Sequence, residues 1–191
     1  MLLYWAMVCH TIPQHKSQDT DKLGKAIEYF AGGKYHEALI LFVDIDKRYE
    51  LNPRFKGYIG ICYYHEWEYE KACKYLDKAL PQLEVYAPRE RNVYYGAAAE
   101  SHFMLGQYDE AIPIYEKQLL VCHGNEKGDV LYHLGLCHMF KERWQCAADY
   151  LSSAIAYYEK YKSTASHSRL VQTEKMLNGC KKEIEEQGTP D

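Results

Sequence analysis

The sequence predicts an all-α protein built from about four similar helix pairs and one final helix. Two observations lead to this prediction: small and aromatic residues recur with a period near 34, and the composition favours helices. The 191 residues are 47% apolar and 26% charged, with only six prolines. A chain of this composition can bury a continuous core, and it is typical of folded rather than disordered proteins.

The repeat is marked by pairs of small residues twelve positions apart, with an aromatic residue three positions before the second member. The pairs are Ala26 and Ala38, Gly60 and Ala72, Ala99 and Ala111, and Gly135 and Ala147, and the aromatics are Tyr35, Tyr69, Tyr108 and Trp144. Successive marker alanines are 34, 39 and 36 residues apart. Because antiparallel helices that approach closely leave room only for small side chains, each pair predicts one helix hairpin.

Larger residues and turn residues recur around these pairs. Four positions after each alanine, on the same helical face, stand Phe42, Leu76, Tyr115 and Leu151. Between the two helices of the first and third copies lie Gly33 and Gly106. Glycine adopts positive φ without strain, so these residues predict tight helix exits.

Residues 104–117 carry the most complete copy of the pattern. Their run Leu-Gly-Gln-Tyr-Asp-Glu-Ala, which ends at Ala111, and the following Tyr115 resemble the tetratricopeptide repeat family. The resemblance implies a right-handed superhelical solenoid with four repeats, at about 19–53, 54–88, 89–124 and 125–162. One departure is Gln118, which occupies the place of the apolar Ile45, Ala79 and Ala154 in the other copies.

Residues 163–191 are predicted to form a capping helix and a tail. Between His167 and Gln187 an apolar stripe with a spacing of three or four contains Leu170, Thr173, Leu177, Cys180 and Ile184. A solenoid must cover the apolar end of its last repeat, so a helix with one apolar side is expected there. Gly179 lies in the middle of this helix, where glycine costs about 1 kcal/mol relative to alanine, and marks a point at which the helix is expected to break.

Residues 1–18 leave two alternatives open, an export leader or a disordered tail. The apolar run Met1 to Val8 is shorter than the roughly 20 residues that span a bilayer as a helix. It also lacks a preceding Lys or Arg and a small-x-small cleavage pattern. The compartment stays open: a leader would indicate export to a periplasm or beyond, whereas unpaired cysteines favour the cytoplasm.

The cysteines number seven, an odd count, and no two are spaced as Cys-x-x-Cys. Cys62 and Cys137 follow the small glycines of the second and fourth copies by two residues, so they are expected to be buried thiols. Bridges from Cys62 to Cys73 or from Cys137 to Cys146 remain an alternative that spacing does not decide.

The sequence predicts no catalytic or cofactor chemistry. It contains no glycine-rich phosphate loop, no GxSxG and no HExxH, so an enzyme, a cofactor and a small-molecule substrate are not expected. His102 and His138 occupy the interior place of Tyr29 and Tyr63, so they are interpreted as packing residues rather than metal ligands. The net charge of −4, without clustered Lys and Arg, argues against a nucleic-acid partner.

A binding surface for another polypeptide is the remaining prediction. By the family resemblance, the first helices of the repeats line a concave groove. Its side chains would be Ile27, Phe30, Tyr58, Ile61, Tyr64, His65, Glu100, Phe103, Met104, Tyr132, Leu136, Met139 and Phe140. Such an apolar, aromatic groove suits an extended peptide or an amphipathic helix, which makes the chain a non-catalytic scaffold or adaptor. The alternative is a structural or assembly factor tethered to a membrane through the N-terminal segment.

Overall fold

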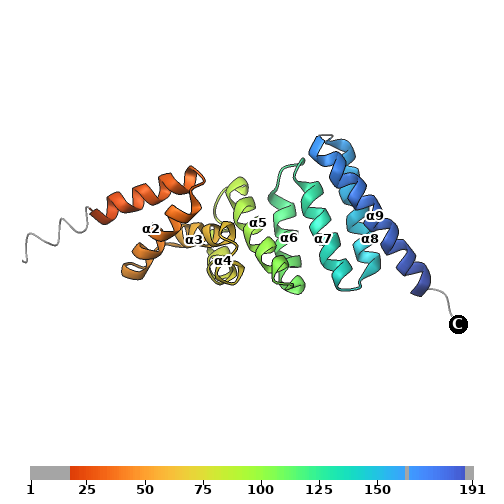
Figure 1. The fold of residues 1–191 in the computed structure, drawn as a ribbon, viewed down its shortest axis with the longest axis horizontal. Coiled ribbons are helices and arrows are strands. Elements are labelled where there is room, and N and C mark those ends of the chain that lie inside the picture. The colour runs from red at the N-terminus through yellow and green to blue at the C-terminus, as the bar shows by residue number, and fades with distance from the viewer. Residues whose placement is uncertain (1–17, 162–163, 188–191) are drawn as a thin grey trace, which may run out of the picture. The chain divides into compact units, whose positions relative to one another are not determined.

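The computed structural model describes residues 18–161 and 164–187, and these are almost entirely helical. The first helix covers residues 18–31. It is followed by α2 (Tyr35–Arg48), α3 (Pro53–His65), α4 (Tyr69–Leu83), α5 (Pro88–Met104), α6 (Tyr108–Val121), α7 (Lys127–Phe140), α8 (Trp144–Lys160) and α9 (Thr164–Gln187) (Figure 1). The described residues contain no strand, so the predicted all-α class, with four helix pairs and a final helix, is confirmed.

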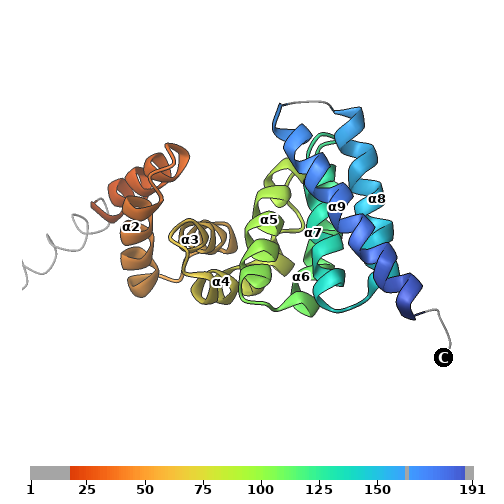
Figure 2. The same ribbon diagram turned by 45° about the vertical axis from the view of Figure 1, so that its right-hand side comes forward.

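The chain divides into two compact units. Unit 1 ends at Leu83 and contains the first helix and α2 to α4, and unit 2 begins at Glu84 and contains α5 to α9. In unit 1, α3 packs on both α2 and α4. In unit 2, each helix packs on the next, and α7, α8 and α9 lie side by side (Figure 2).

Each hairpin turn contains one residue in the left-handed region. These residues are Gly33, Trp67, Gly106 and Glu142, with φ of 72°, 62°, 71° and 55°. Each turn is closed by a hydrogen bond between backbone groups five residues apart, such as Arg143 N to His138 O at 2.9 Å. The predicted glycine exits are therefore present in the first and third copies. In the other two copies a residue with a Cβ takes the same conformation, which costs about 1 to 2 kcal/mol.

The small residues of the repeat make room for a leucine in the paired helix. A Cβ atom on Gly60 would lie 2.5 Å from Cγ of Leu76, and one on Gly135 would lie 2.7 Å from Cγ of Leu151. Both leucines are fully buried. The glycine thus allows the leucine one turn beyond the marker alanine to pack against the backbone of the first helix.

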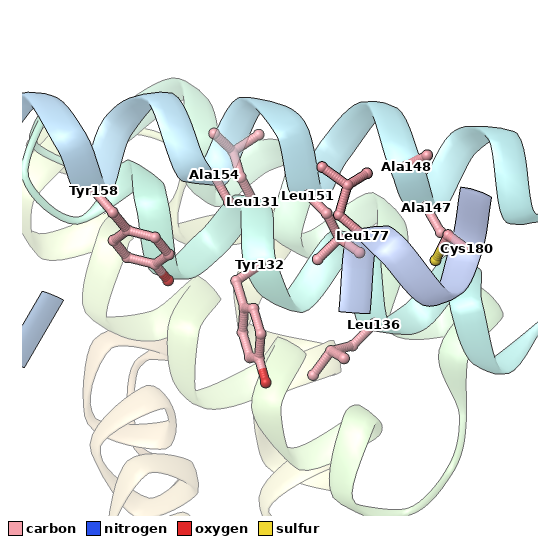
Figure 3. Close-up of a cluster of buried hydrophobic side chains, with 10 residues drawn as sticks. All are labelled: Leu131, Tyr132, Leu136, Ala147, Ala148, Leu151, Ala154, Tyr158, Leu177 and Cys180. Atoms are coloured by element: carbon pink, nitrogen blue, oxygen red, sulfur yellow. The ribbon is translucent and has the colours of Figure 1, made fainter. Parts of the chain in front are cut away.

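The final helix α9 covers the apolar side of the last helix pair. Thr173 and Cys180 are buried, and Leu177 is 9% exposed. Figure 3 shows Leu177 and Cys180 of α9 beside Leu151 and Ala147 of α8, within one hydrophobic cluster. The predicted capping stripe is confirmed.

The predicted break in this helix is wrong. The helix α9 continues through Gly179. A Cβ atom at this position would meet nothing within 4 Å, so Gly179 lies on the open side of the helix. The contacts of the stripe residues on either side of Gly179 outweigh its weak helix propensity.

The N-terminal alternatives lie outside the described residues, except for Gln18. So do residue 162 of the fourth predicted repeat and residues 163 and 188–191 of the C-terminal prediction. None of the helices in the described part of the chain is both long enough and apolar enough to cross a bilayer.

The cysteines of the described residues are all free thiols, so neither open disulfide pairing is present among them. Cys62, Cys73, Cys122, Cys137 and Cys180 are buried, and Cys146 is exposed. Burial, assisted by the negative charge of Glu66, raises the pKa of Cys62 to about 12. Burial likewise raises the pKa of Cys137 to about 12.

Candidate functional site

Aromatic rings of the first helix, α2 and α3 contact one another in unit 1. We define the unit 1 face as Ile27, Phe30, Tyr35, Tyr58, Tyr64 and His65. The Phe30 ring stacks on Tyr58 with centroids 4.3 Å apart, and Tyr35 stacks on His65 at 3.7 Å. Tyr64 meets the His65 ring edge-on at 5.0 Å. Because each ring is held by a neighbour, the face presents a fixed set of planar surfaces.

A second aromatic face lies on unit 2. We define the unit 2 face as Glu100, Phe103, Met104, Tyr108, His133, Met139 and Phe140. The Tyr108 ring stacks on Phe140 with centroids 5.0 Å apart, and Phe103 lies 6.1 Å from the same ring. Met104 and Phe140 are 51% and 53% exposed, so they are apolar side chains that protrude into solvent.

The two faces are built from repeat-equivalent contacts. Tyr35 and Tyr108 begin the second helix of the first and third copies, and each stacks on the last residue of the next first helix. The Phe103 ring lies 5.4 Å from His133, in the place of the stacked pair of Phe30 and Tyr58. The repeat pattern therefore places rings at equivalent positions in each unit, although Phe103 and His133 are tilted by 57° where Phe30 and Tyr58 are stacked at 20°.

A pair of polar or charged groups follows the stacked rings in the sequence of each unit. In unit 1, Nδ1 of His36 lies 2.8 Å from Oε2 of Glu66. At the equivalent position of unit 2, Asp109 forms ion pairs with Lys141 and Arg143. These pairs are largely exposed, so they contribute little to stability. The neighbours of the two faces therefore differ: a histidine with a carboxylate in unit 1, and a carboxylate with two cations in unit 2.

The buried Tyr115 joins Glu100 and His133 of the unit 2 face in a polar centre. The Tyr115 hydroxyl donates to Oε2 of Glu100 at 2.7 Å, and Nδ1 of His133 lies 3.0 Å from the same oxygen. Burial raises the pKa of Glu100, but the hydrogen bonds with His133 and Tyr115 outweigh it and hold the pKa below its ordinary value. The unit 2 face thus carries a partly buried carboxylate that stays ionised at neutral pH.

Three of the predicted groove residues do not reach the surface. Tyr132 and Leu136 are 3% and 8% exposed, because they pack in the same cluster as Leu177 of α9, and the Arg169 guanidinium lies 4.7 Å from the centre of the Tyr132 ring. Ile61 is 3% exposed within α3, which packs between α2 and α4. The prediction that these three side chains line an exposed groove is wrong. The other ten are partly or largely exposed, and their place in a binding groove stays a prediction.

Three residues of the faces were not predicted as binding residues. Tyr35 and Tyr108 were interpreted as hairpin markers, and His133 was assigned no role. The recurrence of an aromatic residue three positions before the alanine was the signal that could have placed the tyrosines. No comparable pattern marks His133, because its equivalents in the other copies differ in type.

The interior histidines have packing partners. Nδ1 of His102 lies 2.7 Å from Oε1 of Gln107, and the His138 ring stacks on Tyr150 at 5.2 Å. Burial, with a smaller effect of the positive Arg143, lowers the pKa of His138. In the described part of the chain, no group of three or more His, Cys, Asp or Glu side chains is arranged to hold a metal ion.

The fold is similar to that of several solved structures, although no protein-family model and no curated protein matches the sequence. MamA AMB-1 has a TM-score of 0.63 and 17% identity, over 92% of this chain and 95% of that one. RapI in its apo form has a TM-score of 0.67 and 15% identity, over 88% of this chain and 65% of that one. A chain of the Cut9–Hcn1 hetero-tetramer of APC/C has a TM-score of 0.61 and 14% identity, over 81% of this chain and 29% of that one. This chain has a tetratricopeptide-type repeat fold. At these identities the likeness concerns the fold alone.

Proposed function

We propose that this protein is a non-catalytic scaffold that binds a peptide or an amphipathic helix of a partner protein through its aromatic faces. The observation that carries the proposal is the protrusion of Met104 and Phe140 from the unit 2 face, each about half exposed. Exposed clusters of large apolar side chains mark interaction sites in proteins. Aromatic anchors commonly supply much of the binding energy at such sites.

The arrangement of the unit 2 face supports binding to a preformed surface. The Phe140 ring is held by its stack on Tyr108, so it loses little side-chain freedom when a partner covers it. The unit 1 face has the same construction around His65 and Tyr35. Cut9–Hcn1, one of the similar structures, is an assembly of two kinds of protein, which is consistent with a scaffold role for this fold.

The polar centre suggests what a partner would carry. Glu100 keeps its charge beside Phe103 and His133, and its side chain is 26% exposed. A partner segment with apolar side chains for Met104 and Phe140 and one basic side chain near Glu100 would complement this face. The membrane-tethered alternative depends on residues 1–18, and no observation on the described residues favours it.

The proposal is tested by affinity purification of the parent and of two double variants. Met104→Ala with Phe140→Ala removes the protruding side chains of the unit 2 face. The matched control, Val85→Ala with Leu120→Ala, removes the equally apolar side chains in the same unit that are 86% and 84% exposed and lie outside the face. We expect partners of the parent to be retained by the control and lost from the face variant, with melting temperatures near that of the parent. Retention of every partner by the face variant would contradict the proposal.

A further inference from the structure

A pocket of about 200 Å³ lies in unit 1, apart from the aromatic faces. It is lined by Asp46 of α2, Lys56 of α3, and Lys74, Tyr75 and Lys78 of α4. Lys74 and Lys78 are four positions apart, so they stand on the same side of their helix. We call these five residues the lysine pocket. None of them belongs to the unit 1 face.

The single carboxylate of the lysine pocket is already engaged. Oδ1 of Asp46 accepts a hydrogen bond from the backbone N–H of Leu51 at 3.2 Å, and the Tyr75 hydroxyl lies 3.5 Å from Oδ2. Burial, followed by the negative charge of Asp46, raises the pKa of Tyr75, so this phenol stays protonated and able to donate. Asp46 therefore serves to order the pocket wall as well as to offset charge.

The lysines of the pocket are only partly compensated. Nζ of Lys56 lies 3.1 Å from Glu50, a carboxylate that is 89% exposed and well hydrated. Among the described residues, no ion pair or side-chain hydrogen bond engages the ammonium group of Lys74 or of Lys78. Three ammonium groups against the carboxylates of Asp46 and Glu50 leave an excess of about one positive charge at the pocket.

The size and the charge of the lysine pocket define the ligand. At about 30 Å³ for each water molecule, its volume corresponds to roughly six or seven waters. This is below the range of about 300 to 1,000 Å³ that is typical of sites for drug-sized molecules. A phosphate monoester carries about −1.5 to −2 charges at neutral pH, and lysine binds it as a compact point charge.

We propose that the lysine pocket binds the phosphate group of a phosphorylated ligand. The proposal does not depend on the aromatic faces and concerns a different part of unit 1. The phosphate could belong to a small molecule or to a phosphoserine of a polypeptide, and both present the same dianionic group to Lys56, Lys74 and Lys78.

The test uses the full chain and two probes, free O-phosphoserine and a short phosphoserine peptide, with the unphosphorylated peptide for comparison. Binding is measured by isothermal titration calorimetry for the parent, for Lys74→Gln with Lys78→Gln, and for a control with the same charge change. The control, Lys175→Gln with Lys181→Gln, replaces two exposed lysines of α9. Circular dichroism establishes that both variants stay folded.

We expect at least one phosphorylated probe to bind saturably and the pocket variant to lose about tenfold in affinity, while the control changes less than about twofold. Tighter binding of the peptide than of free phosphoserine would assign the phosphate to a polypeptide, and equal binding would assign it to a small molecule. Equal losses in both variants, or no saturable binding of either probe, would overturn the proposal.

Discussion

The Tyr108 ring at the start of α6 stacks on the Phe140 ring at the end of α7, with centroids 5.0 Å apart and planes 14° from parallel. Tyr35 and His65 form the equivalent stack in unit 1, at 3.7 Å and 5°. The aromatic residue that marks each of these copies in the sequence therefore also fixes an exposed ring of the following repeat. The contacts that order the helix pairs also build the aromatic faces.

The glycines of the repeat allow a test of the close helix approach. Gly135→Ala would place a Cβ atom 2.7 Å from two side-chain atoms of the buried Leu151, so it is expected to lower the free energy of unfolding by about 1 to 3 kcal/mol. Gly179→Ala is the control, because a Cβ atom there meets nothing within 4 Å, and it should raise stability by roughly 0.5 to 1 kcal/mol. Chemical denaturation measures both. If the two variants unfold alike, the close approach at Gly135 is not a constraint.

The turn before α8 offers a stabilising substitution. Glu142 has a φ of 55°, in the place of Gly33 and Gly106 in the first and third copies. Glu142→Gly should relieve the steric cost of this conformation and raise the free energy of unfolding by up to about 1 kcal/mol, since the gain exceeds the added flexibility of the unfolded chain. Thermal melting measures the change. A lower melting temperature than that of the parent would show that contacts of the Glu142 side chain outweigh the backbone strain.

The polar centre of the unit 2 face should respond to acid. The pKa of Glu100 is lowered in the folded state, so its stabilising contribution is present above the ordinary value of 4.5 and is lost as the pH falls from there through the lowered value. Glu100→Gln removes this contribution. The free energy of unfolding of the parent should therefore exceed that of the variant at pH 7. This difference should narrow as the pH falls below the ordinary glutamate pKa of 4.5. A gap that is constant from pH 7 down to the acid limit of folding would contradict this assignment.

Thiol labelling should separate the cysteines by burial. Cys146 is exposed, whereas Cys62 and Cys137 are buried and have pKa values raised to about 12. Among the described cysteines, a thiol-reactive reagent should modify Cys146 first in the native protein and the others only after denaturation. Mass-spectrometric peptide mapping gives the order, and Cys146→Ser should abolish the fast reaction of this set. Rapid native labelling of Cys62 or Cys137 would show that their helix pairs open readily.

The helix pairs and the cap could be predicted from the sequence because they depend on local geometry. Helical spacing alone places Leu170, Leu177 and Cys180 on one stripe. The structure buries Leu177 and Cys180 and packs the partly buried Leu170 against their cluster. The burial of Tyr132 could not be predicted in the same way. Its burial depends on where α9 packs, and the spacing of residues within α7 contains no information on that packing.

The candidate sites could be predicted only in part for the same reason. Of the thirteen predicted groove residues, Ile61, Tyr132 and Leu136 are buried, and the role of the other ten stays a prediction. Lys56 is 18 positions from Lys74 in the sequence, and only the packing of α3 beside α4 brings both into one pocket. Because these lysines are spread along the sequence, no basic run marks this local concentration of positive charge.

The most direct measurement of the central claim is site-specific photo-crosslinking from the unit 2 face. Benzoylphenylalanine replaces Phe140 in one protein and Leu120, 84% exposed outside the face, in a second. Both are irradiated with the proteins that co-purify with the parent, and the adducts are identified by mass spectrometry. We expect position 140 to form a covalent adduct with a discrete polypeptide partner, and position 120 to form none with that partner. Adducts that are the same at both positions, or that arise from position 120 alone, would contradict a protein-binding role for the aromatic face.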